Sequence, residues 1–309
     1  MGHGHAHHDH RQGVSRKLIA ATAITLIFIV LELIVGFVSH SLALIGDALH
    51  NFTDVLALVI AFVALRLERR PATREKTYGY QRAGILAAFV NAGTLVAFTM
   101  FLFVEAFERF RQPGPVDSAM MILVASVAVV MNVAIGLALR RDGKDDINIR
   151  SAVVHQLGDA LSAVGIIIAA FLIRRTGSSL WDPGITVLIG ILILWSSWGI
   201  LREAVNLLLE GTPAGLDTAA VTRSLEAIEG IAGAHHVHIW ALGPSSPALS
   251  CHLLIGDVPM RSTTSMLDQV TEMLQREYGI VHATVQFEFA HCKDDDPFCI
   301  PWKGSASGL

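Results

Sequence analysis

Six apolar stretches, each long enough to cross a lipid bilayer, occupy most of this chain. A membrane-spanning helix needs about 20 consecutive apolar residues. The stretches run from Leu18 to Val38, Leu42 to Leu65, Ala83 to Phe107, Val116 to Leu139, Ala152 to Ile173 and Ile185 to about Val205. We therefore expect an α-helical membrane protein with six transmembrane helices.

The composition agrees with a membrane protein. Hydrophobic residues make up 52% of the chain and charged residues only 16%, whereas charged residues reach about 25% in soluble domains. The net charge of −4 provides no basis for binding nucleic acid. The three cysteines all lie late in the chain and form no paired framework, which fits a reducing compartment. The first apolar stretch is too long for a cleavable signal peptide, so we expect none.

Basic residues between the apolar stretches predict the orientation in the membrane. They lie before the first stretch, between residues 66 and 82, and between residues 140 and 150. The connections on the opposite side hold few of them. Because basic residues accumulate on the cytoplasmic side, we expect both termini in the cytoplasm.

After residue 210 the pattern changes to that of a soluble domain. Helical and strand patterns alternate at Ala219 to Glu229 (helix), His235 to Leu242 (strand), Ala248 to Ile255 (strand), Ser262 to Tyr278 (helix) and His282 to Phe289 (strand). This order predicts a small cytoplasmic α/β domain, with helices on one face of a mixed sheet. The expected organisation is a His-rich tail (1–16), a six-helix membrane domain (17–209), the α/β domain (210–293) and a flexible tail (294–309).

Ionisable residues stand inside the second and fifth apolar stretches. Each charged group near the centre of a bilayer costs about 3 kcal/mol or more, so a partner must compensate for it. His50 and Asp54 are four residues apart and share one helical face, and the same spacing returns at His155 and Asp159. Two facing helices would bring together two imidazoles and two carboxylates, which can complete a tetrahedral shell around Zn²⁺. A simple hydrogen bond between helices would account for one such pair, but it accounts less well for a pair that recurs at identical spacing.

Other polar residues in the apolar stretches receive different interpretations. Asp47 lies three residues before His50, on nearly the same face, and we interpret it as a support for the ligands rather than as a ligand. Four further polar residues are expected to form interhelical hydrogen bonds or to line an aqueous cavity, namely Glu32, Asn91, Glu105 and Asn132.

Six segments of the chain carry a resemblance to a known family. They are SLALIGDALHNFTDVLAL, YGYQRAGILAAFVNAG, VVHQLGDALSAVG, WDPGITVLIGILI, LLLEGTP and HVHIWAL. These segments resemble the cation diffusion facilitator family, in the zinc-transporting branch related to bacterial cobalt-zinc-cadmium resistance transporters and animal vesicular zinc exporters. The resemblance extends over almost the whole chain.

The resemblance implies a homodimer in the lipid bilayer of the bacterial inner membrane that exports cytoplasmic Zn²⁺ in exchange for H⁺ by alternating access. It implies no enzymatic activity, no organic cofactor and no nucleic acid partner. The implied transport site consists of His50, Asp54, His155 and Asp159, the residues that the spacing also selects. Export of Cd²⁺ or Co²⁺ stays open as an alternative, because similar ligands bind these ions.

Two other functions fit the sequence less well. An intramembrane metalloprotease would usually carry the motif H-E-x-x-H, which does not occur in this sequence. A passive metal channel is disfavoured because a complete ligand shell binds too tightly for conduction.

The resemblance further implies a metallochaperone-like fold for the soluble domain, with Zn²⁺ as a regulatory ligand near the dimer interface. The positions that match its ligands are His238, His252 and His282, with Glu288, Cys292 and Cys299 as additional candidates. We interpret His235 and His236 as exposed residues where a strand begins. The connections between the second and third and between the fourth and fifth stretches contain no histidine, so a further metal site in these loops is not expected.

The chain begins with MGHGHAHHDH, in which histidine alternates with Gly, Ala and Asp. A purification tag is the alternative, but tags are usually uninterrupted runs of one residue. We interpret the tract as a weak, accessory collector of Zn²⁺. Its histidines are His3, His5, His7, His8 and His10.

Overall fold

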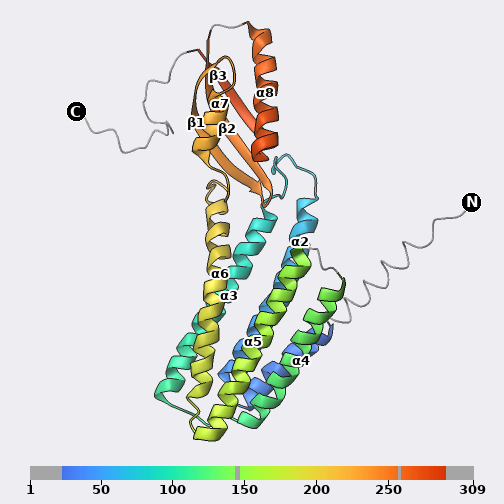
Figure 1. Cartoon of the computed structure of the whole chain (residues 1–309), viewed down its shortest axis with the longest axis vertical. Coiled ribbons are helices and arrows are strands. Elements are labelled where there is room, and N and C mark those ends of the chain that lie inside the picture. The colour runs from blue at the N-terminus through green and yellow to red at the C-terminus, as the bar shows by residue number, and fades with distance from the viewer. Residues whose placement is uncertain (1–22, 143–146, 257–258, 290–309) are drawn as a thin grey trace, which may run out of the picture. The chain divides into compact units, whose positions relative to one another are not determined.

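The structure is a computed structural model that describes residues 23–142, 147–256 and 259–289. Along the chain, a series of long helices is followed by a small α/β domain (Figure 1). The N-terminal His tract, Cys292 and Cys299 lie outside the described residues.

Apolar helices make up the first part of the described chain. The first helix covers Ala23–Val38. The others are α2 (Leu42–Glu68), α3 (Ala83–Arg111), α4 (Ser118–Asp142), α5 (Ile147–Thr176) and α6 (Trp181–Leu208). In the described part of the chain, the five helices α2 to α6 are long and apolar enough to span a membrane, and Ala23–Val38 is a shorter apolar helix. The predicted helical membrane domain is therefore confirmed, whereas residues 18–22 of the first predicted span lie outside the described residues.

Large apolar side chains cover the outer surfaces of these helices. Leu161 is 71% exposed and Trp195 is 81% exposed, which would be costly in water at about 25 cal/mol for each Å² of apolar surface. Lipid tails remove this cost. Small residues instead fill the contacts between helices: Ala125 of α4 and Ala170 of α5 are fully buried in one cluster. This inverted pattern is typical of helices that pack within a membrane.

Asp182 of α6 holds the first turn of α2. The backbone N–H groups of Leu42 and Ala43 donate hydrogen bonds to its carboxylate at 2.8 and 3.2 Å, and the Ser41 hydroxyl donates at 2.6 Å. Asp182 is fully buried, and Arg109 Nη1 lies 3.5 Å from its Oδ2. The first N–H groups of a helix have no acceptor within the helix, so Asp182 caps α2 from another helix. This contact holds the start of α2, the helix that carries His50 and Asp54.

The soluble domain contains the elements in the predicted order, helix, strand, strand, helix, strand. They are α7 (Thr218–Glu226), β1 (Ile231–Gly243), β2 (Ser246–Ile255), α8 (Met260–Tyr278) and β3 (His282–Glu288). The strands lie in the order β1-β2-β3, with β1 antiparallel and β3 parallel to β2. Parallel strands need a crossover connection, which α8 supplies. The predicted small α/β domain with a mixed sheet is confirmed.

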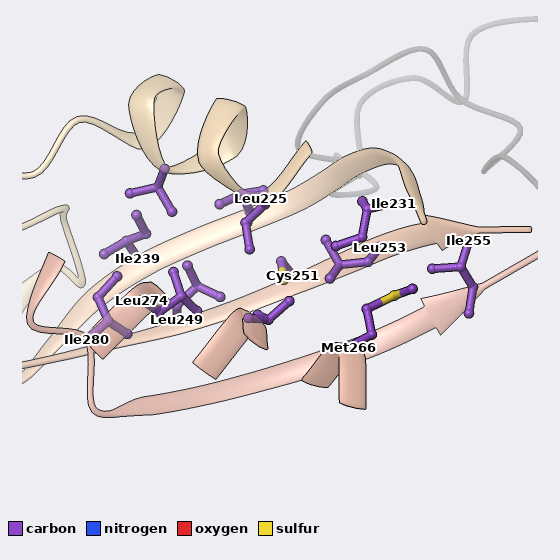
Figure 2. Packing of buried hydrophobic residues seen from close by; sticks show 13 residues of the cluster. Leu225, Ile231, Ile239, Leu249, Cys251, Leu253, Ile255, Met266, Leu274 and Ile280 are labelled. Carbon is purple, nitrogen blue, oxygen red and sulfur yellow. The ribbon is translucent and has the colours of Figure 1, made fainter. Parts of the chain in front are cut away.

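One face of this sheet packs against both helices (Figure 2). Every second residue of β2 is buried on this face, namely Leu249, Cys251, Leu253 and Ile255. Leu225 of α7 and Leu274 of α8 belong to the same cluster. Because side chains alternate along a strand, His252 points to the opposite face.

The strand β1 begins at Ile231, four residues before the predicted start. Ile231 pairs with Ile255 at the far end of β2 and is 8% exposed. The small residues Gly233 and Ala234, which have low strand propensity, separate Ile231 from the recognisable pattern. The pairing with β2, rather than local propensity, extends the strand.

Candidate metal-binding sites

Two helices of the membrane domain bring four ionisable side chains together. His50 and Asp54 lie one turn apart on α2, and His155 and Asp159 lie one turn apart on α5. The spacing of four residues places each pair on one helical face. The structure therefore places all four predicted transport residues in one group, which we call the membrane ligand group.

Each imidazole in this group lies close to a carboxylate from both helices. His50 Nε2 is 3.7 Å from Asp54 Oδ2 and 3.6 Å from Asp159 Oδ1. His155 Nε2 is 3.2 Å from Asp54 Oδ2 and 3.6 Å from Asp159 Oδ2. Ligand atoms at about 2.0–2.2 Å from a tetrahedral Zn²⁺ lie about 3.3–3.6 Å from one another. The observed separations are therefore close to those of atoms that share one metal ion, and most exceed hydrogen-bond length.

The membrane ligand group is enclosed on one side and open on the other. The side chain of Asp159 is 7% exposed and that of His50 is 18% exposed, whereas Asp54 and His155 reach 31% and 47%. The buried Nδ1 atom of His50 has no hydrogen-bond partner among the described residues. An ion can approach the group from the side of His155, because this side chain is the most exposed of the four.

Asp47 lies beside this group rather than in it. Its Oδ2 accepts a hydrogen bond of 3.3 Å from the Asn51 amide, one turn further along α2, and its side chain is 2% exposed. Glu105, another polar residue of the spans, pairs with a basic residue of its own helix. Its carboxylate lies 3.7 Å from Arg109 within α3.

A second group of ligand-type side chains lies on the face of the sheet opposite to the core. His235 and His236 of β1 and His252 of β2 can each offer one ring nitrogen, and these atoms all lie within 4.8 Å of one another. The Glu288 carboxylate at the end of β3 is 3.1 Å from His235 Nε2 and 2.8 Å from His252 Nδ1. Three imidazoles and one carboxylate form a donor set that suits Zn²⁺. We call these four residues the sheet ligand group.

A β-bulge explains why adjacent histidines of β1 reach the same ligand group. Successive residues of a regular strand point to opposite faces. Here the pairing with β2 shifts between His235 and His238, and His236 has a φ of 51°, in the left-handed region that residues other than glycine rarely adopt. His235 pairs with His252, and the bulge turns the His236 ring to stack on the His252 ring with centroids 4.5 Å apart.

The pKa values of two residues in the sheet ligand group, Glu288 and His236, are lowered by their neighbours. Partial burial acts to raise the pKa of Glu288, but the charge of His252, the hydrogen bond from the Gln286 amide and the interaction with His235 outweigh it and hold this pKa below its ordinary value. The pKa of His236 is lowered by burial and by the positive charges of the neighbouring histidines. An ionised carboxylate and a neutral imidazole are the forms that bind Zn²⁺.

The predicted ligands of the soluble domain fall into different places. His252 and Glu288 belong to the sheet ligand group. His282 pairs in register with Ala248, at the other end of β2, and its ring lies 5.5 Å from that of Tyr78. The structure does not bring His282 together with His252 within one chain.

The prediction that His235 and His236 are exposed residues at the start of a strand is wrong. Both lie inside β1, and the His235 side chain is 16% exposed. His238 stays at the edge of the group, with its ring centroid 6.4 Å from that of His236. The alternation rule assigned adjacent residues to opposite faces, and a bulge leaves no periodic signal in the sequence. Two consecutive histidines in a strand were the available clue.

Comparisons with known proteins give a consistent assignment. The cation efflux transmembrane domain matches residues 18–209, and the cytoplasmic domain of cation efflux proteins matches residues 213–290. The zinc transporter ZitB of Escherichia coli (strain K12) is 39% identical over 301 residues, which cover 96% of this chain and 95% of ZitB. A cadmium, cobalt and zinc/H(+)-K(+) antiporter of Bacillus subtilis is 33% identical over 299 residues, which cover 95% of this chain and 96% of the antiporter.

A solved structure of the metal-bound C-terminal domain of the CzcD transporter from Cupriavidus metallidurans is 30% identical, with a TM-score of 0.22, and covers 24% of this chain and 99% of that chain. The transmembrane-domain match extends over more than half of the present chain, and both full-length relatives match it nearly end to end. These matches confirm the resemblance that the sequence motifs carry. The chain belongs to the cation diffusion facilitator family, in its zinc-transporting branch.

Proposed function

We propose that this protein exports cytoplasmic Zn²⁺ in exchange for H⁺ by alternating access, and that the membrane ligand group is its transport site. The observation that carries the proposal is the set of four contacts, 3.2 to 3.7 Å long, between two imidazoles and two carboxylates on spanning helices. Charged groups at this depth are costly, and a shared cation compensates for them. The names of the relatives, a zinc transporter and a cadmium, cobalt and zinc/H(+)-K(+) antiporter, support the same function.

Competition between Zn²⁺ and H⁺ supplies the coupling. Zn²⁺ binds imidazole only in its neutral form and carboxyl groups in their ionised form, so each ligand holds either the metal or a proton. The pKa of an ordinary imidazole is about 6.5, which lies between the pH of an acidified exterior and that of a near-neutral cytoplasm. Protons that enter from outside can therefore displace the metal there and leave again on the cytoplasmic side.

The division of ligands between α2 and α5 allows release. Each helix holds one imidazole and one carboxylate. A movement of α2 against α5 separates the cross-helix pairs His50–Asp159 and His155–Asp54 and opens the shell, while each helix keeps its own pair. This is the rocking motion that alternating access requires.

We further propose the finer topology and assembly. The helix Ala23–Val38 forms the end of the first of six spans. An even number of spans, together with the positive-inside rule, puts both termini in the cytoplasm of a bacterial cell with the protein in its inner membrane. The chain acts as a homodimer, with domains at residues 1–16, 17–209, 210–293 and 294–309.

The sheet ligand group is proposed as a regulatory Zn²⁺ site. Its donors, His235, His236, His252 and Glu288, lie in the soluble domain and not in a spanning helix. Metal bound there would favour one arrangement of the soluble domain and so change the transport rate without forming part of the path. The N-terminal histidines would act as a weak accessory collector.

Transport in proteoliposomes tests the exchange. Purified protein is reconstituted with a Zn²⁺-sensitive dye and a pH-sensitive dye inside the vesicles, and a pH gradient of either sign is imposed. We expect Zn²⁺ flux that reverses with the gradient and is accompanied by opposite H⁺ flux. Parallel assays with Cd²⁺, Co²⁺ and Mn²⁺ should rank Mn²⁺ last, because imidazole ligands disfavour it. Zn²⁺ flux that does not respond to the pH gradient would overturn the proposal.

A further inference from the structure

Glu32, on the helix Ala23–Val38, is a buried carboxyl that the membrane ligand group does not use. Its exposed fraction is 0%, and neither carboxyl oxygen has a hydrogen-bond partner among the described residues. An ionised carboxylate in such a place loses its hydration and gains no hydrogen bond in return. In this conformation, Glu32 is therefore accommodated as the neutral acid, with a proton on one oxygen.

Glu32 is nevertheless linked to the transport site by charge. The groups that interact with its side chain are Asp47 and Asn51 of α2. Asp47, which is 2% exposed, lies three residues before His50 on α2 and therefore on nearly the same helical face. The carboxyl group of Asp47 thus lies close both to Glu32 and to the α2 part of the membrane ligand group.

Among the described residues, the carboxyl groups of Glu32 and Asp47 have few hydrogen-bond donors. The Asn51 amide donates to Asp47 Oδ2 at 3.3 Å, whereas neither Glu32 oxygen accepts a hydrogen bond from a described residue. When two carboxyl groups lie close together and have few hydrogen-bond donors, one of them stays protonated. A divalent cation bound to the membrane ligand group stabilises negative charge nearby. Binding of the cation therefore favours the ionised carboxylate and the release of its proton.

We propose that Glu32 is a proton-binding residue of the exchange, which releases H⁺ when Zn²⁺ enters the membrane ligand group and regains it when Zn²⁺ leaves. On the cytoplasmic side, the O–H bond of the Glu32 carboxyl breaks, the proton passes to water, and the electron pair stays on the carboxylate. On the outer side, water delivers a proton to the same oxygen. This inference rests on the proposed Zn²⁺/H⁺ exchange, because it adds a proton carrier that is not itself a metal ligand.

The test counts the protons that each full-length protein molecule releases when its Zn²⁺ sites are filled. Calorimetric titrations in buffers of different ionisation enthalpy give this number for the wild type, Glu32→Gln and Glu105→Gln. The control is matched because Glu105 is another carboxyl of a spanning helix, but it is 38% exposed and pairs with Arg109. We expect Glu32→Gln to bind Zn²⁺ with about one proton fewer released, and Glu105→Gln to match the wild type. An unchanged proton count in Glu32→Gln would overturn the proposal, as would binding of a second Zn²⁺ that depends on Glu32.

A measurement on the wild-type protein covers the case in which Glu32→Gln does not fold. Infrared difference spectra of protein labelled at its glutamate carboxyl carbons should show one protonated glutamic acid that loses its proton on addition of Zn²⁺. Absence of that band near neutral pH would overturn the role of Glu32. Proteoliposomes separate this inference from the exchange itself: a wild type without coupled H⁺ flux refutes the exchange, whereas coupled flux with an unchanged ratio in Glu32→Gln refutes only the role of Glu32.

Discussion

His155 Nε2 of α5 lies 3.2 Å from Asp54 Oδ2 of α2, which is the shortest contact in the membrane ligand group. The reciprocal pair, His50 Nε2 and Asp159 Oδ1, is separated by 3.6 Å. Neither helix alone offers more than one imidazole and one carboxylate from this group. The four side chains therefore lie together only while α2 and α5 keep this relationship, and the proposed role of each can be tested separately.

Asp159→Asn should abolish Zn²⁺ transport while the protein stays folded. Asparagine keeps the shape of the side chain but removes an anionic ligand from the most enclosed part of the group, where Asp159 is 7% exposed. Zn²⁺ flux into proteoliposomes measures the loss, and size-exclusion chromatography checks the fold. Asp117→Asn is the matched control, because Asp117 accepts hydrogen bonds from Ala119 and Met120 at the start of α4, where asparagine caps equally well. Wild-type flux from Asp159→Asn would contradict the site assignment.

His50→Asp should change metal selectivity. The substitution exchanges a borderline nitrogen ligand for a hard oxygen ligand, so the preference should move from Zn²⁺ and Cd²⁺ towards Mn²⁺. Competition of each metal against Zn²⁺ in the flux assay measures the change. A metal profile identical to that of the wild type would place His50 outside the shell around the ion.

Asp182→Ala should destabilise the membrane domain. The change leaves Leu42 N–H, Ala43 N–H and the Ser41 hydroxyl without their buried acceptor, at a cost of about 1–3 kcal/mol. Thermal unfolding in detergent, monitored by size-exclusion chromatography, should show a lower midpoint temperature for Asp182→Ala than for the wild type. Asp182→Asn keeps one acceptor oxygen and should lose less. Equal midpoints for Asp182→Ala and the wild type would show that α2 does not depend on this cap.

His252→Ala should lower transport several-fold at limiting Zn²⁺ without abolishing it. His252 contributes one of the ring nitrogens of the sheet ligand group and contacts Glu288 at 2.8 Å. The number of Zn²⁺ ions bound to full-length protein should fall as well. His282→Ala is the control, because His282 is exposed and lies beside Tyr78. Loss of bound Zn²⁺ in His282→Ala, but not in His252→Ala, would favour the ligand set that the family resemblance implies over the one that the fold brings together.

Deletion of residues 2 to 10 should raise the apparent Michaelis constant for Zn²⁺ modestly and leave the maximal rate nearly unchanged. A tethered collector changes the local supply of metal but not the conformational step of the carrier. Flux measured over a range of free Zn²⁺ concentrations separates the two parameters. If the deletion were as inactive as Asp159→Asn, the N-terminal histidines would have to belong to the transport pathway.

The membrane domain could be predicted from the sequence because its signals are local. Spanning helices need only a long apolar stretch, and α2 to α6 occur where such stretches were recognised. The candidate transport residues follow from two local facts: ionisable groups are costly in lipid, and a spacing of four residues defines one helical face. The order of elements in the soluble domain was likewise visible, because each element carries its own periodicity.

The sequence by itself thus determined the apolar helices, the α/β order and four candidate ligands in the membrane, since each depends on residues close together in the chain. Only the tertiary structure decided which groups from distant segments meet. Asp182 caps α2 across 140 residues of chain, and the bulge at His236 brings two adjacent histidines to His252 and Glu288. Strand register and bulges depend on pairing between segments, and helix contacts depend on packing, so neither leaves a periodic pattern that can be recognised along one chain.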